Sequence, residues 1–135
     1  MNNLDSFSTI IYKKLQSSFA DQDCAYEIDK EQLVVDFPCP DMAEMGGMIV
    51  QTTSDHHIWL RIHPGCSAYL IDGLEELISV MQEVMADRVC WVIGFAGDEW
   101  IETTLIRNKD DLELEQGAEY HLYSWSGNLD EVLKA

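Results

Sequence analysis

Basic residues are scarce in this chain. Lys and Arg together number 8, against 25 Asp and Glu, and the formal net charge is −17 at pH 7. A surface of this sign repels phosphate backbones and anionic lipid headgroups, so it argues against nucleic acid and membrane as partners and favours basic proteins. The hydrophobic content of 47%, which includes 4 Trp, 5 Tyr and 4 Phe, excludes an acidic disordered tail, because such tails are poor in apolar residues.

Long apolar runs are also missing. No stretch reaches the roughly 18 consecutive apolar residues that a membrane span needs. The N-terminus lacks the basic region and apolar run of a signal peptide. The sequence therefore predicts a cytoplasmic protein.

C-x-x-C pairs are missing as well. The cysteines are widely spaced, and each lies beside apolar or turn residues. This pattern predicts reduced, mostly buried thiols rather than disulfides or a metal centre. They are Cys24, Cys39, Cys66 and Cys90.

Catalytic and metal-binding motifs are not found either. There is no G-x-S-x-G elbow and no glycine-rich phosphate loop. His57 and His63 could share one face of a strand, but they would lie about 20 Å apart, which is too far for one metal ion. We therefore expect no enzymatic activity, no catalytic residues, no metal ligands and no cofactor.

The hydrophobic periodicity predicts one α+β domain over residues 1–135, with two main helices packed on a mostly antiparallel sheet. The expected order is helix, four strands, helix, three strands and a short terminal helix. Residues 68–71 are ambiguous between strand and helix, and Asp72 with Glu75 resembles a capping box. Helices are expected over 3–20, 72–86 and 128–133, and strands over 24–29, 31–37, 48–53, 56–63, 89–95, 100–107 and 118–125.

A run of carboxylates between the last two expected strands is the first candidate for partner binding. Strict alternation would place Glu113 and Glu115 on one face and Leu112 and Leu114 on the other. The run is either a solvated edge that discourages sheet pairing or a docking surface for a Lys/Arg-rich partner. Its members are Asp110, Asp111, Glu113 and Glu115, with Glu119 just beyond.

Aromatic residues on the polar faces of two strands are the second candidate. Trp59 shares a face with Arg61, and Tyr123 and Trp125 share a face with His121 and Glu119. Exposed, these side chains would be interface anchors, since Trp, Tyr and Arg are enriched there. The alternative is that the second helix covers the face and the aromatics belong to the core.

These features predict a non-enzymatic inhibitor or immunity-type protein that neutralises a basic partner, such as a nuclease toxin, by occlusion. The carboxylates would steer and pair with the partner, and Trp59 or Trp125 would anchor it. A DNA mimic, whose carboxylates imitate phosphates, is an alternative, and so is a domain whose acidity serves only solubility. The sequence leaves open whether the chain is a monomer or a homodimer.

A further alternative rests on the order of elements. The opening helix at 4–19, the hairpin at 24–37 and the middle helix at 74–86 resemble the layout of class I type III secretion chaperones. That resemblance implies a small acidic homodimer that holds an effector segment in extended form. The contacts would come from Met42, Met45 and Met48 and from exposed strand faces, and the middle helix would join the subunits. The late strand at 118–125 and the short terminal helix depart from the layout.

Overall fold

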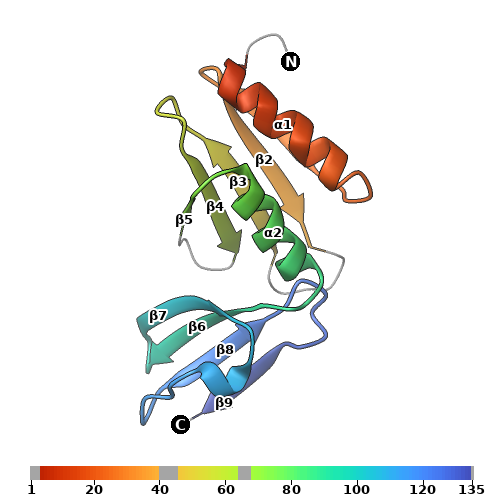
Figure 1. The fold of residues 1–135 in the computed structure, drawn as a ribbon. Coiled ribbons are helices and arrows are strands. Elements are labelled where there is room, and N and C mark those ends of the chain that lie inside the picture. Colours follow the sequence, from red (N-terminus) through yellow and green to blue (C-terminus); the bar gives the residue numbers. More distant parts are fainter. Residues whose placement is uncertain (1–3, 40–45, 64–67, 135) are drawn as a thin grey trace.

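The computed structural model describes residues 4–39, 46–63 and 68–134. Two helices and two antiparallel sheets confirm the predicted α+β class (Figure 1). The strands form two separate sheets rather than one, in the orders β1-β2-β3-β4-β5 and β7-β6-β8-β9. The elements are α1 (Ser6–Ser18), β1 (Ala25–Asp29), β2 (Gln32–Pro38), β3 (Gly47–Thr52), β4 (Ile58–His63), β5 (Ala68–Ile71), α2 (Leu74–Met85), β6 (Cys90–Ala96), β7 (Glu99–Ile106), the 3₁₀ turn η1 (Lys109–Asp111), β8 (Glu119–Tyr123) and β9 (Glu131–Lys134).

Helix α1 begins where the sequence supplies an N-cap. The Asp5 carboxylate accepts a hydrogen bond from the Ser8 backbone N–H at 2.7 Å. This bond lowers the pKa of Asp5 below its ordinary value of 3.8. The helix buries Ile11 and Leu15 against the first sheet, and Phe19 packs edge-on against Phe37 of β2.

We expect Asp5→Ala to lower the free energy of unfolding by about 1 kcal/mol, because one helix-end N–H loses its partner. The sign of the pH dependence follows from the lowered pKa of Asp5. The contribution is present above the ordinary pKa and is lost as pH falls through the folded value. Urea unfolding at pH 7 and near pH 3 should show a smaller difference between wild type and variant at the lower pH, whereas an equal difference would contradict the cap.

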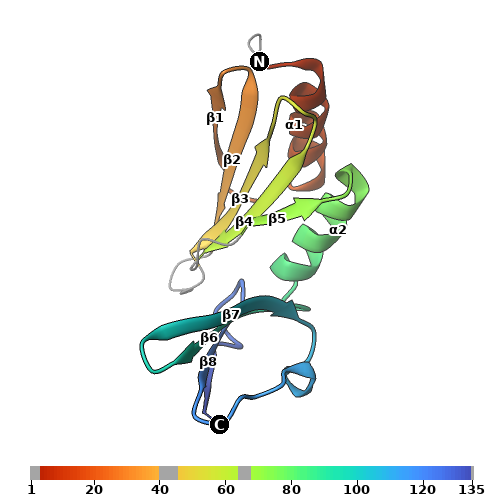
Figure 2. The ribbon, with the colours of Figure 1, turned by 90° about the vertical axis from the view of Figure 1, so that its left-hand side faces the viewer.

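The first sheet is a five-stranded meander with one covered face. Its first hairpin turns at Lys30 and Glu31, and both residues have a positive φ. This backbone conformation is the one that a two-residue hairpin turn requires. The predicted strands over 24–29 and 31–37 leave Lys30 between them, which agrees with this turn. Both helices lie on the same face of the sheet, and no helix of the described residues lies over the opposite face (Figures 1 and 2).

Helix α2 starts differently from the prediction. Gly73 is the N-cap, and no side chain caps the helix. Glu76, not Glu75, reaches back and accepts a hydrogen bond from the Asp72 N–H at 2.7 Å, so the predicted capping box of Asp72 and Glu75 is wrong. The buried side of α2 consists of Leu77, Ile78, Met81 and Val84.

The second sheet is connected to the first by a shared hydrophobic core, which also includes the buried side of α2. Trp91 of β6 is fully buried, and its ring contacts the Tyr69 ring of β5 edge-on, with 5.7 Å between the ring centres. Arg107, which directly follows β7, forms an ion pair with Glu83 of α2, with 2.7 Å between the guanidinium nitrogen and the carboxylate oxygen. Because one continuous cluster of buried side chains runs from α1 through α2 to Trp91 and Ile93, the two sheets pack as parts of one core.

The chain ends in a strand, β9, and the predicted helix over 128–133 is not formed. A helix this short is unstable without strong packing. Instead the Asp130 carboxylate accepts hydrogen bonds from the backbone and hydroxyl of Ser124, which closes a turn. That turn returns the chain alongside β8. Leu133 packs there on a second core cluster, which consists of Val92, Ala118, Tyr120 and Leu122. In the described part of the chain, neither helix has the length and hydrophobicity to cross a bilayer.

Candidate protein-binding surface on the second sheet

One face of the second sheet carries a partly exposed group of aromatic side chains. Glu119, His121 and Tyr123 alternate with the buried residues of β8, so the prediction that they share a face is confirmed. The Phe95 ring of β6 contacts the His121 ring edge-on, with 5.5 Å between the ring centres. The His121 ring stacks with the Tyr123 ring, with 6.4 Å between the ring centres. We call Phe95, Trp100, Glu119, His121 and Tyr123 the aromatic face.

Trp100 joins this face because of a β-bulge. The register shifts between Gly94 and Phe95, so that Phe95 pairs with Trp100 while Gly94 pairs with Glu102. Ile101 is the extra residue. The Trp100 indole N–H donates to the Thr103 hydroxyl, yet the side chain remains 58% exposed. Trp100 was not predicted as a surface residue, since no sequence signal marks the bulge.

The acidic connection between β7 and β8 covers the opposite face. Leu112 packs on the second core cluster with Tyr120 and Leu122. The predicted alternation is wrong, because the segment is not a strand and Leu114 is 45% exposed. Next to it lies a hollow of about 420 Å³ whose lining combines three carboxylates with apolar side chains. The lining residues are Ile101, Glu102, Glu113, Leu114, Glu115 and Tyr120.

Tyr120 fixes the position of this connection. Its hydroxyl accepts a hydrogen bond from the Glu115 backbone N–H at 2.9 Å. Its ring lies against Gly94, where a Cβ atom would stand 2.9 Å from a ring carbon. Gly94 therefore leaves the space that the ring needs, and the buried ring in turn positions the carboxylates around the hollow.

We expect Gly94→Ala to displace the Tyr120 ring and loosen the connection at Glu115. The cost of such overpacking is typically about 1–3 kcal/mol. Thermal unfolding should show the loss, and amide hydrogen exchange should show faster exchange at Glu115. Unchanged exchange at Glu115 would mean that the ring does not hold the connection.

Carboxylates dominate the charge of the second sheet. Arg107 pairs with Glu83, and Lys109 lies 3.3 Å from Glu131, so two basic side chains are already engaged. The hydrogen bond from Arg107 lowers the pKa of Glu83. Residues 90–134 contain the basic residues Arg107, Lys109 and Lys134 and the acidic residues Asp98, Glu99, Glu102, Asp110, Asp111, Glu113, Glu115, Glu119, Asp130 and Glu131.

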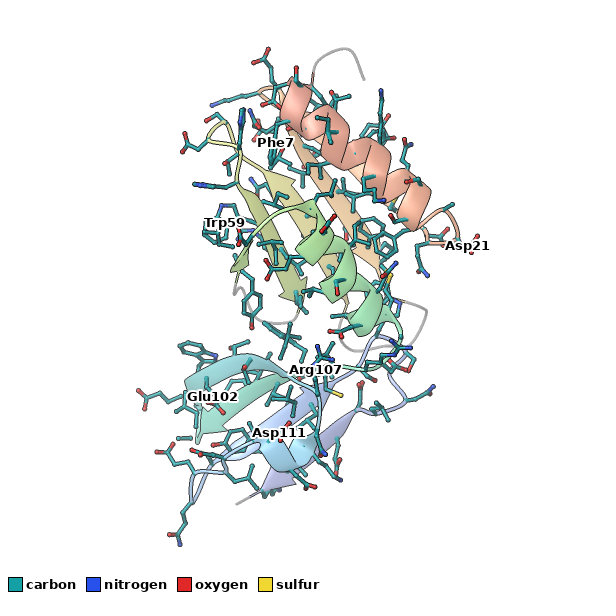
Figure 3. All side chains as sticks on the ribbon, viewed as in Figure 1. Phe7, Asp21, Trp59, Glu102, Arg107 and Asp111 are labelled. Carbon is teal, nitrogen blue, oxygen red and sulfur yellow. The ribbon has the colours of Figure 1, made fainter. Side chains whose placement is uncertain are left out.

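The predicted partner-binding residues do not form one patch. Asp110 and Asp111 lie in η1 and are exposed, as are Glu113 and Glu115 on the connection. Glu119 and Tyr123 lie on the aromatic face, on the other side of the sheet. Figure 3 places Glu102 on the second sheet, Asp111 on η1 next to that sheet, and Trp59 on the first sheet.

Trp59 and Arg61 lie on the face of the first sheet that no helix covers. Ile58, Leu60 and Ile62 of the same strand are buried on the other side. Since α1 and α2 both pack on that buried side (Figure 2), the alternative in which the second helix covers Trp59 is wrong.

Trp125 is a core residue. It is only 3% exposed and belongs to the cluster that includes Trp91. The predicted exposure of Trp125 on the Tyr123 face is therefore wrong, because the strand ends at Tyr123 and the chain turns inward. Met48, a predicted contact residue, is also fully buried, and Met42 and Met45 lie outside the described residues.

The thiols of Cys39 and Cys90 are poorly suited to nucleophilic chemistry. Burial raises the pKa of Cys39 to about 12 and also raises the pKa of Cys90. A thiol is a nucleophile only as the thiolate, so both are unreactive near neutral pH. Cys24, Cys39 and Cys90 are free thiols. No group of three metal-binding side chains occurs within the described ranges.

Comparison with protein-family models, with curated proteins and with solved structures gives no match for this chain.

Proposed function

We propose that the protein is a non-enzymatic binding protein of the inhibitor or immunity type that occludes a basic protein, such as a nuclease toxin, in the cytoplasm. The observation that carries this proposal is that an exposed aromatic side chain and an excess of carboxylates occur together in the part of the chain that forms the second sheet. An exposed tryptophan on an aromatic face belongs to a segment, residues 90–134, that has ten carboxylates and three basic residues. Acidic surfaces steer basic partners, and aromatic side chains supply anchoring area.

The hollow beside the acidic connection suits a Lys or Arg side chain of the partner. Ile101, Leu114 and Tyr120 would contact the aliphatic stem, as apolar surfaces do for long basic side chains. Glu102, Glu113 and Glu115 line the same hollow and would pair with the cationic head. An arginine head would form the stronger, bidentate hydrogen bonds.

The aromatic face adds a second type of contact. Trp100 of β7 presents an exposed ring on the same face as Glu119 of β8, with Phe95 of β6 between them. A cation held over an indole ring gains about 0.5–2 kcal/mol, depending on how well water is excluded. A basic loop that reaches this face would find both a ring and a carboxylate.

Capture from lysate of the native cell tests the proposal. The immobilised protein should retain one basic protein at 50 mM NaCl and release it at 500 mM, because salt screens exposed charges. Mass spectrometry would identify the protein. A partner that is neutral or acidic, or one that high salt does not release, would contradict the proposal, and an unfolded secreted effector would favour the chaperone alternative.

A further inference from the structure

The uncovered face of the first sheet carries two neighbouring rows of side chains, one with Val34 and Trp59 and the other with Asp36 and Arg61. The strand register gives the first row as Glu27, Val34, Gln51, Trp59 and Leu70, and the second as Ala25, Asp36, Ile49, Arg61 and Ala68. Leu70 is 55% exposed. These ten residues include two acidic groups and one basic group, so the face is nearly neutral on a chain whose net charge is −17.

Within the described part of the first sheet, Arg61 and Asp36 have no ionic partner. The ion pairs found among the described residues involve neither of them. They lie on β4 and β2, in one row and on opposite sides of Ile49 in the central strand. Two strand spacings put their backbones about 10 Å apart, and no ion pair joins the two side chains within the described sheet.

We infer that this face binds a second copy of the chain, stacked sheet on sheet around a two-fold axis that runs parallel to β3. Such an axis exchanges the two sides of the sheet, so β2 of one copy faces β4 of the other. Asp36 then meets the partner's Arg61, and Arg61 meets the partner's Asp36. A two-fold interface requires this self-complementarity.

The remaining positions fit the same axis. Val34 would lie opposite the partner's Trp59, and Ile49 opposite the partner's Ile49. At the rim Ala25 would face Ala68, while Glu27 would face Leu70 and stay partly in water. Stacked sheets pack about 10 Å apart and twist relative to each other, so the contacts nearest the axis contribute most.

The size of the face sets the expected strength. Five strands of about five residues cover roughly 20 by 20 Å, or about 400 Å² of projected area on each copy. A standard interface takes about 800 Å² from each partner. We therefore expect a weak dimer with a dissociation constant in the micromolar range, further opposed by the negative charge of both copies.

Sedimentation equilibrium tests the inference over protein concentrations from 1 to 300 µM in 150 mM NaCl, where the Debye length is about 8 Å. Arg61→Asp and Asp36→Arg should each raise the dissociation constant roughly tenfold or more, because each change places two like-charged contacts in the dimer. The double variant D36R/R61D should restore association. A matched control, Asp23→Arg with Lys14→Asp, exchanges charges outside the face and should leave the dissociation constant unchanged.

Wild-type protein that stays monomeric throughout this range would overturn the inference. So would a dimer that survives both single reversals, or reversals that the double variant does not correct. Circular dichroism spectra that match the wild type would show that the variants are folded. The inference is independent of the proposed function, since a partner bound by the second sheet would be captured equally by a monomer or a dimer.

Discussion

Replacing Glu102, Glu113 and Glu115 with Lys should slow association with a basic partner by roughly tenfold to a thousandfold at low salt. These carboxylates line one hollow, and Tyr120 holds the connection that carries two of them. The substitutions remove the attraction and add repulsion at the place where a cationic side chain would bind. Stopped-flow or surface-based kinetics with the captured partner would measure the change.

A matched control separates the local site from the overall charge. Asp21, Asp23 and Asp55 are exposed near the end of α1 and on the turn between β3 and β4, and Asp21 lies far from Glu102 (Figure 3). Their replacement with Lys changes the net charge by the same amount. It should slow association much less than the first variant does. Equal effects would mean that only the total charge matters and that the hollow is not a contact site.

Trp91→Ala should lower the free energy of unfolding by about 3–5 kcal/mol, the usual cost of truncating a large buried aromatic side chain. Trp91 is fully buried at the junction of the two sheets and touches Tyr69 of the first. The loss is a large part of the stability of about 5–15 kcal/mol that is typical of a natural domain. Denaturant unfolding, followed by both near- and far-ultraviolet circular dichroism, would measure it.

Trp100→Ala is the matched control for Trp91→Ala. The same substitution at this exposed position should change stability by about 0.5 kcal/mol or less. Because the sheets share a core, wild type should unfold in one transition that both signals report together. Two separate transitions would show that the sheets are independent domains and would contradict the prediction of a single domain over residues 1–135.

The fold class could be predicted from the sequence because its strongest signals are local. Leu4, Ile11 and Leu15 recur at helical spacing, which predicts a helix. Ile58, Leu60 and Ile62 occupy every second position, which predicts a strand. The division into two sheets depends on which strands pair, and that is decided by contacts distant in the sequence. The terminal strand was missed because the Asp130 turn and its pairing with β8 have no local signature.

The candidate site was predictable only in part. Alternation placed Glu119, His121 and Tyr123 together, because a regular strand fixes which side chains share a face. It failed for Trp125, which lies beyond the end of β8. Trp100 was missed because the bulge at Gly94 and Phe95 determines the face of the sheet on which its side chain lies. A single extra residue in a strand cannot be recognised from the hydrophobic periodicity of the sequence.

Hydrogen exchange of the protein with and without its captured partner tests the central claim most directly, because it maps the contact surface without mutation. We expect protection in the complex at Trp100 to Thr103 and at Glu113 to His121, with exchange in α1 and β1 unchanged. Protection confined to α1 or the first sheet, or none on the second sheet, would contradict the account.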